Sequence, residues 1–171
     1  MTLFVKKTAY SACLVLLCSA TMRGSAADKA LNVKVISEAG AKQVIDAAEH
    51  EAERLHAPCA IAVVDRSGIL VAFLKMDGVR DGSPDLAIGK ARTSALLQRP
   101  SAETESSVNN GRSAFITAGL MTLRGGVPLM VGQEVVGAVG IAGLNKDTDV
   151  TIAEAAAATF TSVSGGQPAS K

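Results

Sequence analysis

Two short apolar segments joined by a tight turn constrain the fold of this chain most. Cys59 to Asp65 is rich in Val, Ile and Ala, Arg66-Ser67-Gly68 follows, and Ile69 to Met76 returns the chain. Strand-forming residues on both sides of so short a connection predict a β-hairpin. Only antiparallel neighbours can be joined by so few residues, so the fold must contain an antiparallel sheet.

The same pattern recurs in the second half of the chain. Gly125-Gly126 and Gly132-Gln133 have the composition of tight turns, and they separate further apolar segments. These segments predict three more strands, at Leu120–Leu123, Val127–Val131 and Val135–Ala142. We therefore expect five strands in all.

Helical patterns surround these strands. Ser37 is placed to cap a helix over Glu38–Leu55, whose apolar residues recur with a period of about 3.6. Ser83 is placed to cap a second helix that Pro84 opens. This helix extends to Gln98 and is ended by Arg99-Pro100. A short helical turn and an alanine-rich final helix are expected over Ser101–Asn109 and Asp149–Phe160. The order of elements favours an α+β fold, a five-stranded antiparallel sheet with helices packed on it.

The first residues have the pattern of a secretory signal. Lys6 and Lys7 precede the apolar run Ala12–Ala20, and Ser25-Ala26-Ala27 supplies small residues at the expected cleavage site. We predict a signal peptide over residues 1–27, a single domain over 28–163, a disordered tail over 164–171, and a periplasmic or secreted protein.

Charge and cysteine content narrow the function of the mature chain. Without the signal, the 17 basic residues fall to 14 against 16 acidic ones, a balance that argues against nucleic-acid binding. No later segment is long and apolar enough to span a membrane. Cys59 is the one cysteine outside the signal, and its apolar strand predicts a buried thiol, with an intermolecular disulfide as an alternative.

No recognisable catalytic motif occurs in the chain. It has no Gly-x-Ser-x-Gly, no P-loop, no Gly-x-Gly-x-x-Gly after a strand and no Cys-x-x-Cys. Its two histidines, His50 and His56, are six residues apart and would point about 240° from each other on one helix. A zinc enzyme is therefore not indicated.

His50 and His56 each have two interpretations. His50 lies on the charged face of the first helix, between Asp46 and Arg54. That face is either solvated, or it meets a subunit or a ligand with Asp46 orienting the imidazole. His56, at the end of the helix, suits a cap that complements the helix dipole. Met76, Met121 and Met130 lie in apolar segments, where methionines usually fill the core.

Lys90 and Arg92 are the other unusual pair. The second helix is apolar on two sides, which suggests that it lies between its own sheet and a neighbouring subunit. Charges at the edge of such a helix either pair with acids or bind an anion such as a carboxylate. Asp65 and Asp77 bracket the hairpin, and each is more typical of a turn cap than of paired acid–base catalysts.

Several phrases of this sequence resemble the GlcG/HbpS-type haem-binding family, which includes the C-terminal domain of PduO-type proteins. The resemblance covers roughly Val35 to Phe160. The segments that carry it are Cys59–Gly78, Ile88-Gly-Lys-Ala-Arg-Thr93, Arg99-Pro100, Gly125-Gly-Val-Pro-Leu129 and Val136-Gly-Ala-Val-Gly140.

The resemblance implies a profilin-like or roadblock-like sheet, haem as cofactor and a homo-oligomer, of four or eight subunits in relatives. It also implies His50 as the axial iron ligand, with His56 as the second choice, and Lys90 and Arg92 as partners of the haem propionates. Many relatives carry a histidine where this chain has Arg112–Thr117, so a ligand there is not expected. Cys59, Met76, Met121 and Met130 are then the other candidate iron ligands. We predict a haem carrier or sensor accessory, with a sensor or redox partner protein, rather than an enzyme. The alternative is a protein or enzyme that binds a small organic acid or a corrinoid through Lys90 and Arg92.

Overall fold

A computed structural model describes residues 31–164. The chain divides between Asn32 and Val33, and every element below belongs to the part that begins at Val33. The predictions of a signal peptide over 1–27 and of a tail after Ser164 lie outside the described residues. The elements, in chain order, are α1 (Glu38–Arg54), β1 (Ala60–Asp65), β2 (Leu70–Lys75), α2 (Ser83–Leu97), α3 (Ser101–Asn109), α4 (Ala114–Thr117), β3 (Gly126–Val131), β4 (Glu134–Ala142) and α5 (Lys146–Ser164).

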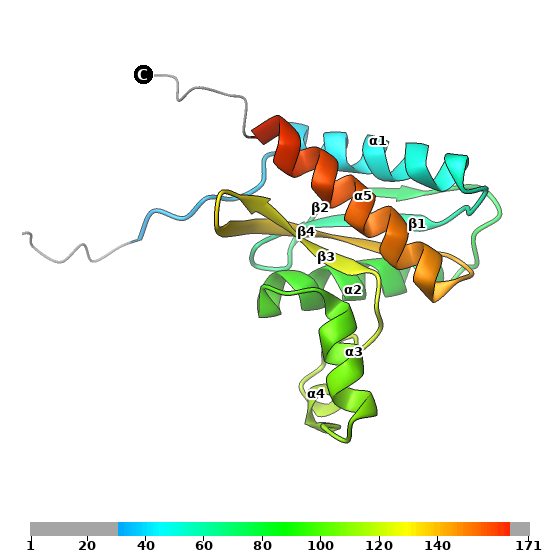
Figure 1. The fold of residues 1–171 in the computed structure, drawn as a ribbon, viewed down its shortest axis with the longest axis vertical. Coiled ribbons are helices and arrows are strands. Elements are labelled where there is room, and N and C mark those ends of the chain that lie inside the picture. Colours follow the sequence, from blue (N-terminus) through cyan, green and yellow to red (C-terminus); the bar gives the residue numbers. More distant parts are fainter. Residues whose placement is uncertain (1–30, 165–171) are drawn as a thin grey trace, which may run out of the picture. The chain divides into compact units, whose positions relative to one another are not determined.

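The described strands form one antiparallel sheet in the order β2-β1-β4-β3. Helices α1 and α5 cover one face of the sheet, and α2 covers the other (Figure 1). Each face has its own apolar core. The first is formed by Val44, Ile61, Ile141 and Ile152 with their neighbours, whereas the α2 side is built from small residues such as Ala62, Ala87, Ala91 and Ala138.

The sheet has four strands in the described part of the chain, and the prediction of a strand over Leu120–Leu123 is wrong. Side chains of α2 and α3 form hydrogen bonds with backbone groups of this segment. The Met121 N–H donates to Thr93 Oγ1 at 2.9 Å, and the Leu123 carbonyl accepts from Ser101 Oγ at 2.7 Å. These bonds fix the segment against α2 and α3, and its backbone does not pair with β3 or β4.

The helix ends follow local capping chemistry. Ser37 Oγ accepts from the Gly40 N–H at 3.1 Å, which confirms it as the cap of α1. Helix α5 begins three residues earlier than predicted, because Asn145 Oδ1 accepts from the N–H groups of Asp147 and Thr148. Ser83 is the first residue of α2 rather than its cap, since Gly82 precedes it without a side-chain bond.

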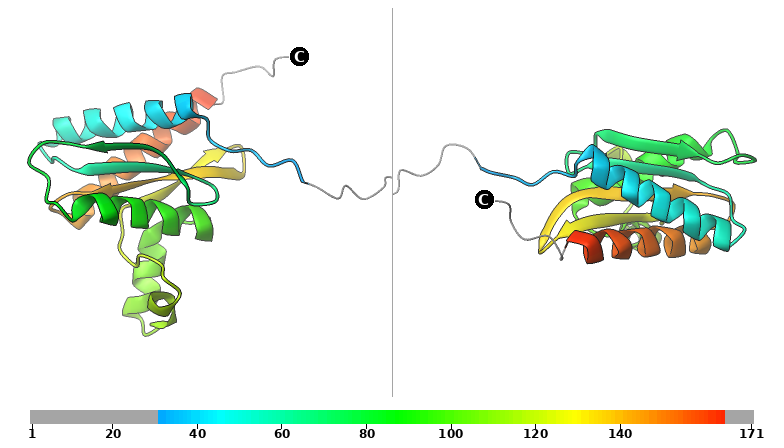
Figure 2. Two further views of the ribbon diagram at one scale, coloured as in Figure 1. Left: turned by 180° about the vertical axis from the view of Figure 1, so that it is seen from behind. Right: turned by 90° about the horizontal axis from the view of Figure 1, so that it is seen from above.

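The predicted hairpin is confirmed. Strands β1 and β2 pair antiparallel, and Asp65 Oδ1 accepts from the N–H groups of Ser67 and Ile69 at 2.8 and 2.9 Å. Asp65 is thus a turn cap, as its position after a strand predicts. Beyond α2, helices α3 and α4 extend away from the sheet (Figure 2).

Candidate functional site

A groove lies between α1 and α5 on one face of the sheet. It has a volume of about 570 Å³, within the range of about 300–1,000 Å³ that is usual for small-molecule sites. Helix α1 contributes a stripe with helical spacing, and α5 supplies the opposite wall. The lining residues are Gln43, Asp46, Ala47, His50, Glu51, Ala155, Thr159 and Phe160.

Small side chains produce this hollow. The opposite stripe of α1, which includes Ala41, Val44 and Ala48, packs onto the core. Ala47 is half-buried beside it, and His50 is exposed. Ala47 and Ala155 line the groove from the two helices, and neither side chain is long enough to fill the space between them. Alanine at these positions therefore leaves an apolar floor.

His50 is the histidine of this groove. It is exposed, so its imidazole is accessible to a ligand without unfolding of α1. Asp46 lies one turn earlier and lines the same groove, but no hydrogen bond joins it to His50 within residues 31–164. The predicted orienting contact is therefore not formed in this structure.

His56 lies in a different place. It follows α1 with a positive φ of 49° and lines a separate hollow of about 390 Å³, together with Asn145 and Thr148 at the start of α5. His50 and His56 therefore line two different hollows. They do not share a site within one chain.

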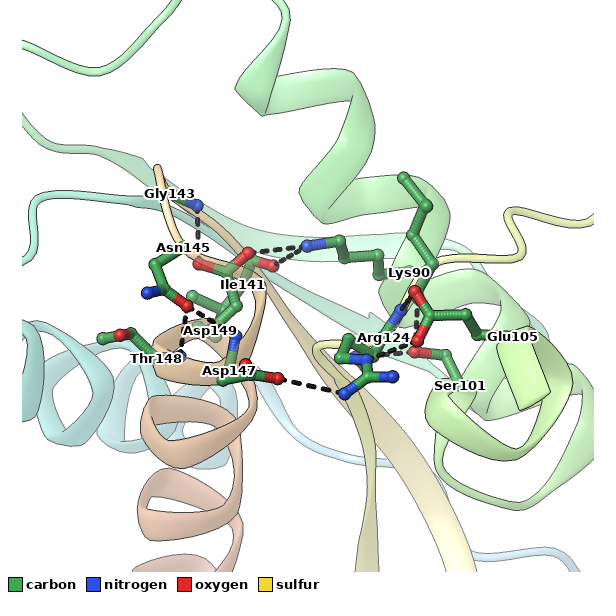
Figure 3. Close-up of polar contacts among 12 residues, drawn as sticks. Lys90, Ser101, Glu105, Arg124, Ile141, Gly143, Asn145, Asp147, Thr148 and Asp149 are labelled. Atoms are coloured by element: carbon green, nitrogen blue, oxygen red, sulfur yellow. Dashed lines mark hydrogen bonds and ion pairs between the residues drawn. The ribbon is translucent and has the colours of Figure 1, made fainter. Parts of the chain in front are cut away.

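Lys90 is buried and connects α2 to two other elements of the fold. Its Nζ donates to Asp149 Oδ2 at 2.8 Å and to the Ile141 carbonyl at 2.7 Å (Figure 3). The other oxygen of Asp149 accepts from the Gly143 N–H at 2.7 Å. Lys90 and Asp149 are each 4% exposed. The interpretation in which Lys90 pairs with an acid is therefore the one that the structure shows, and the pair joins α2, β4 and α5.

The paired glycines at the start of β3, Gly125 and Gly126, make room for this ion pair and for the backbone of α2. A Cβ at Gly125 would lie 3.1 Å from Lys90 Nζ and 2.9 Å from the Ile141 carbonyl oxygen, and the φ of Gly125 is 108°. A Cβ at Gly126 would lie 2.2 Å from the Lys90 carbonyl oxygen. The backbone at Gly125 and Gly126 thus passes closer to α2 than any residue with a side chain could. This contact joins two of the segments that carry the family resemblance, Ile88–Thr93 and Gly125–Leu129.

Arg92 lies on the outer side of α2 and is exposed. Its Nε donates to the Gly68 carbonyl at 3.1 Å, which ties α2 to the hairpin turn. Since α2 covers the face of the sheet opposite to α1, neither Lys90 nor Arg92 lies in the groove of His50 (Figure 1). The predicted site residues thus lie on opposite faces of the sheet.

A second polar network was not predicted. Arg124 pairs with Glu105 of α3 and, through Nη1, with Asp147 Oδ1 at 3.0 Å (Figure 3). It anchors α3 and the start of α5 to the segment before β3. The members of each pair, Lys90 with Asp149 and Arg124 with its two acids, are far apart in the sequence, and no local pattern marks them as partners.

Two sulfur-bearing candidates are also placed by the structure. Cys59 is fully buried, as predicted, and burial raises the pKa of its thiol to about 12. The Met76 sulfur accepts from the Cys59 N–H at 3.4 Å. Neither residue lines the groove of His50. Within the described residues, no cluster of three or more His, Cys, Asp or Glu could hold a metal ion.

A family model described as haem degrading protein HbpS-like matches residues 36–158. The chain belongs to the HbpS-like family. Protein GlcG of Escherichia coli strain K12 is 42% identical over 108 residues, which make up 63% of this chain and 81% of that protein. The resemblance expected from the sequence phrases is therefore confirmed.

Solved structures agree with this assignment. A crystal structure of a double mutant of HbpS from Streptomyces reticuli is 26% identical with a TM-score of 0.71, and the match covers 90% of this chain and 98% of that one. A crystal structure of a PduOC–haem complex is also 26% identical, with a TM-score of 0.66 and coverage of 72% and 94%. The described helices of the present chain include none long and apolar enough to cross a membrane.

Proposed function

We propose that this protein binds haem in the groove between α1 and α5 and acts as a carrier or sensor accessory. The observation that carries the proposal is membership of the HbpS-like family, whose description names haem, together with the likeness to a PduOC–haem complex. The groove adds a place for the ligand, since it combines an apolar floor with an accessible histidine.

The residues of the groove fit the ring and the iron of a porphyrin. A porphyrin requires an apolar surface and an axial ligand such as histidine. Ala47, Ala155 and Phe160 offer the surface, and His50 offers an imidazole nitrogen. Bound haem would supply its iron as the redox and gas-binding centre.

The rim of the groove constrains the orientation of the haem. Asp46 and Glu51 line it, whereas no lysine or arginine does. Carboxylates repel one another, so the propionates would point away from these acids and toward solvent or another subunit. Arg92 of the same chain lies across the sheet and is not placed to receive them.

We further propose that the protein is exported to the periplasm or secreted. Lys6, Lys7, the apolar run after them and Ser25-Ala26-Ala27 support this. The alternative ligand, a small organic acid or a corrinoid, was based on Lys90 and Arg92. Because Lys90 is buried against Asp149, binding of such a ligand would depend on Arg92 alone.

Haem titration of two matched variants tests the proposal. His50→Ala should shift the Soret band of the complex and weaken binding, whereas His56→Ala should leave both unchanged, since His56 lines another hollow. Residual binding by His50→Ala is expected, because burial of the porphyrin contributes about 25 cal/mol per Å² without any iron ligand. If the wild type shows no Soret shift on titration, haem is not the ligand. If both variants keep the wild-type spectrum, His50 is not the axial residue.

A further inference from the structure

The groove of His50 adjoins a second hollow of about 450 Å³ at the start of α1. Gln43 and Phe160 line both spaces, so they lie on the boundary between them. Gln43 is seven residues before His50, which places the two on the same side of α1, about 10 Å apart along its axis. A ligand in the groove can therefore extend past Gln43 into the second hollow.

The charged residues of the two spaces are opposite in sign. Asp46 and Glu51 line the groove. Lys34 lines the second hollow, and neither aspartate nor glutamate is among the residues that line it within the described part of the chain. An anionic group carried by a ligand in the groove is repelled by the two acids and attracted by the lysine beyond them.

Lys34 lies on a segment that is fixed to the sheet just before α1. The Ile36 N–H donates to the Val136 carbonyl at 2.9 Å, and the Ile36 side chain is buried in the core. Lys34 Nζ lies 3.3 Å from Glu134 Oε1, and both side chains are more than half exposed. Such exposed pairs are weak, and an ammonium has three N–H donors. A ligand carboxylate can therefore share Lys34 with Glu134 or displace it.

Phe160 of α5 gives the boundary an apolar floor. Its ring is buried, and a Cβ at Gly40 would lie 3.3 Å from its Cε2. The glycine thus lets the ring pack against the first turns of α1. An aromatic ring here offers contact to the edge of a porphyrin, while the Gln43 amide beside it offers N–H donors to a polar substituent of that edge.

We propose that Lys34 binds one propionate of the haem in the hollow at the start of α1, with the Gln43 amide as a second donor. This inference rests on the proposed function, in which the iron faces His50. Haem carries both propionates on one side of its ring, so a ring centred at His50 can extend a carboxylate past Gln43 to Lys34. The other propionate extends into solvent. The contact orients the ring in the groove and selects tetrapyrroles that carry a free carboxylate on that side.

Titration with haem and with haem dimethyl ester tests this assignment, because the ester keeps the ring and the iron but has no anionic carboxylates. Lys34→Met should weaken haem binding about fivefold to tenfold, the loss expected for one hydrogen bond to a charged group. It should leave the affinity for the ester and the Soret maximum of the haem complex unchanged, since the iron ligand is untouched. Glu134→Gln should strengthen haem binding, because it removes the acid that competes for Lys34.

The matched control is Lys42→Met. Lys42 is an exposed lysine of α1 that pairs with Glu38 and lines neither space, so its loss should leave both affinities unchanged. Circular dichroism checks that each variant is folded.

Two results would overturn the assignment while the proposed function stands. In one, Lys34→Met binds haem as the wild type does. In the other, it loses the same affinity for haem and for the ester, which would give Lys34 a role in the shape of the site and not in carboxylate binding. A wild type that shows no Soret shift with haem refutes the proposed function and this inference together.

Discussion

Lys90 and Asp149 form a buried ion pair that connects three elements. Taking either partner away leaves the other charge buried without compensation, which typically costs about 3–5 kcal/mol. We expect Lys90→Met to lower the free energy of unfolding by about that amount, and the double variant K90M/D149L to lose less than the sum of the two single changes. Urea unfolding followed by circular dichroism measures both.

An exposed pair provides the control for this experiment. Lys42 Nζ lies 2.6 Å from Glu38 Oε1 on the solvent side of α1. Since exposed pairs contribute little to stability, Lys42→Met should change the urea midpoint hardly at all. If Lys90→Met behaves like Lys42→Met, the buried pair does not hold α2 against α5, and the role that we assign to it is wrong.

Burial of Cys59 makes stability depend on alkaline pH. Its thiol has a pKa of about 12 in the folded chain against an ordinary value of 9.0. Between these values the unfolded chain loses this proton and the folded chain keeps it, so stability falls as pH rises from about 9 toward 12. The loss from this group is at most about 1.4 kcal/mol per pH unit.

The comparison that isolates this effect is with Cys59→Ala. Unfolding of both proteins in urea at pH 8 and pH 10 should show a larger loss of stability for the wild type than for the variant. The folded thiol should also resist a thiol reagent at pH 8 and react once the chain is unfolded. Rapid labelling of the folded protein would contradict the burial on which this prediction depends.

At the scale of elements, Gly125 and Gly126 determine how closely β3 can approach α2. Gly126→Ala should destabilise the protein by about 1–3 kcal/mol or more, because the added methyl would overlap the Lys90 carbonyl oxygen. Gly82→Ala is a matched control, since a Cβ there meets nothing within 4 Å and its φ of −79° suits any residue. Thermal unfolding of the two variants measures the difference. Equal melting temperatures would show that β3 can move away from α2 without cost.

Much of the fold was predictable because local patterns determine it. Helical periodicity, the Ser37 cap and the turn at Asp65 gave α1 and the hairpin to within a few residues. The strand expected at Leu120–Leu123 failed because an apolar run does not reveal its hydrogen-bond partners. Here Thr93 and Ser101 supply them from helices that come earlier in the chain.

The candidate site was less predictable, for a related reason. Periodicity shows which residues share a face of one helix, but not which side of the sheet that helix covers. His50 on α1 and Arg92 on α2 therefore looked compatible in the sequence, although the sheet separates them. Asp149, the partner of Lys90, is 59 residues away and carries no local signal of that contact.

At the scale of the whole molecule, the sheet separates the predicted site residues. The α1–α5 face holds the groove of His50, whereas Lys90 and Arg92 belong to α2 on the other face. Changes on the α2 face should therefore leave the Soret band of the haem complex unaffected.

Export is a further prediction at this scale. The basic start, the apolar run and Ser25-Ala26-Ala27 predict cleavage near Ala27. N-terminal sequencing of the exported protein should begin within a few residues of Asp28. An exported form that retains Met1 would contradict the signal peptide but would leave the proposal of haem binding unaffected.

The proposed function places haem between α1 and α5 with its iron facing His50. The most direct test is a crystal structure of the haem complex with diffraction data collected at the iron absorption edge. We expect one anomalous peak per chain in this groove, within bonding reach of the His50 imidazole. A peak beside His56, or on the α2 face against Arg92, would contradict it.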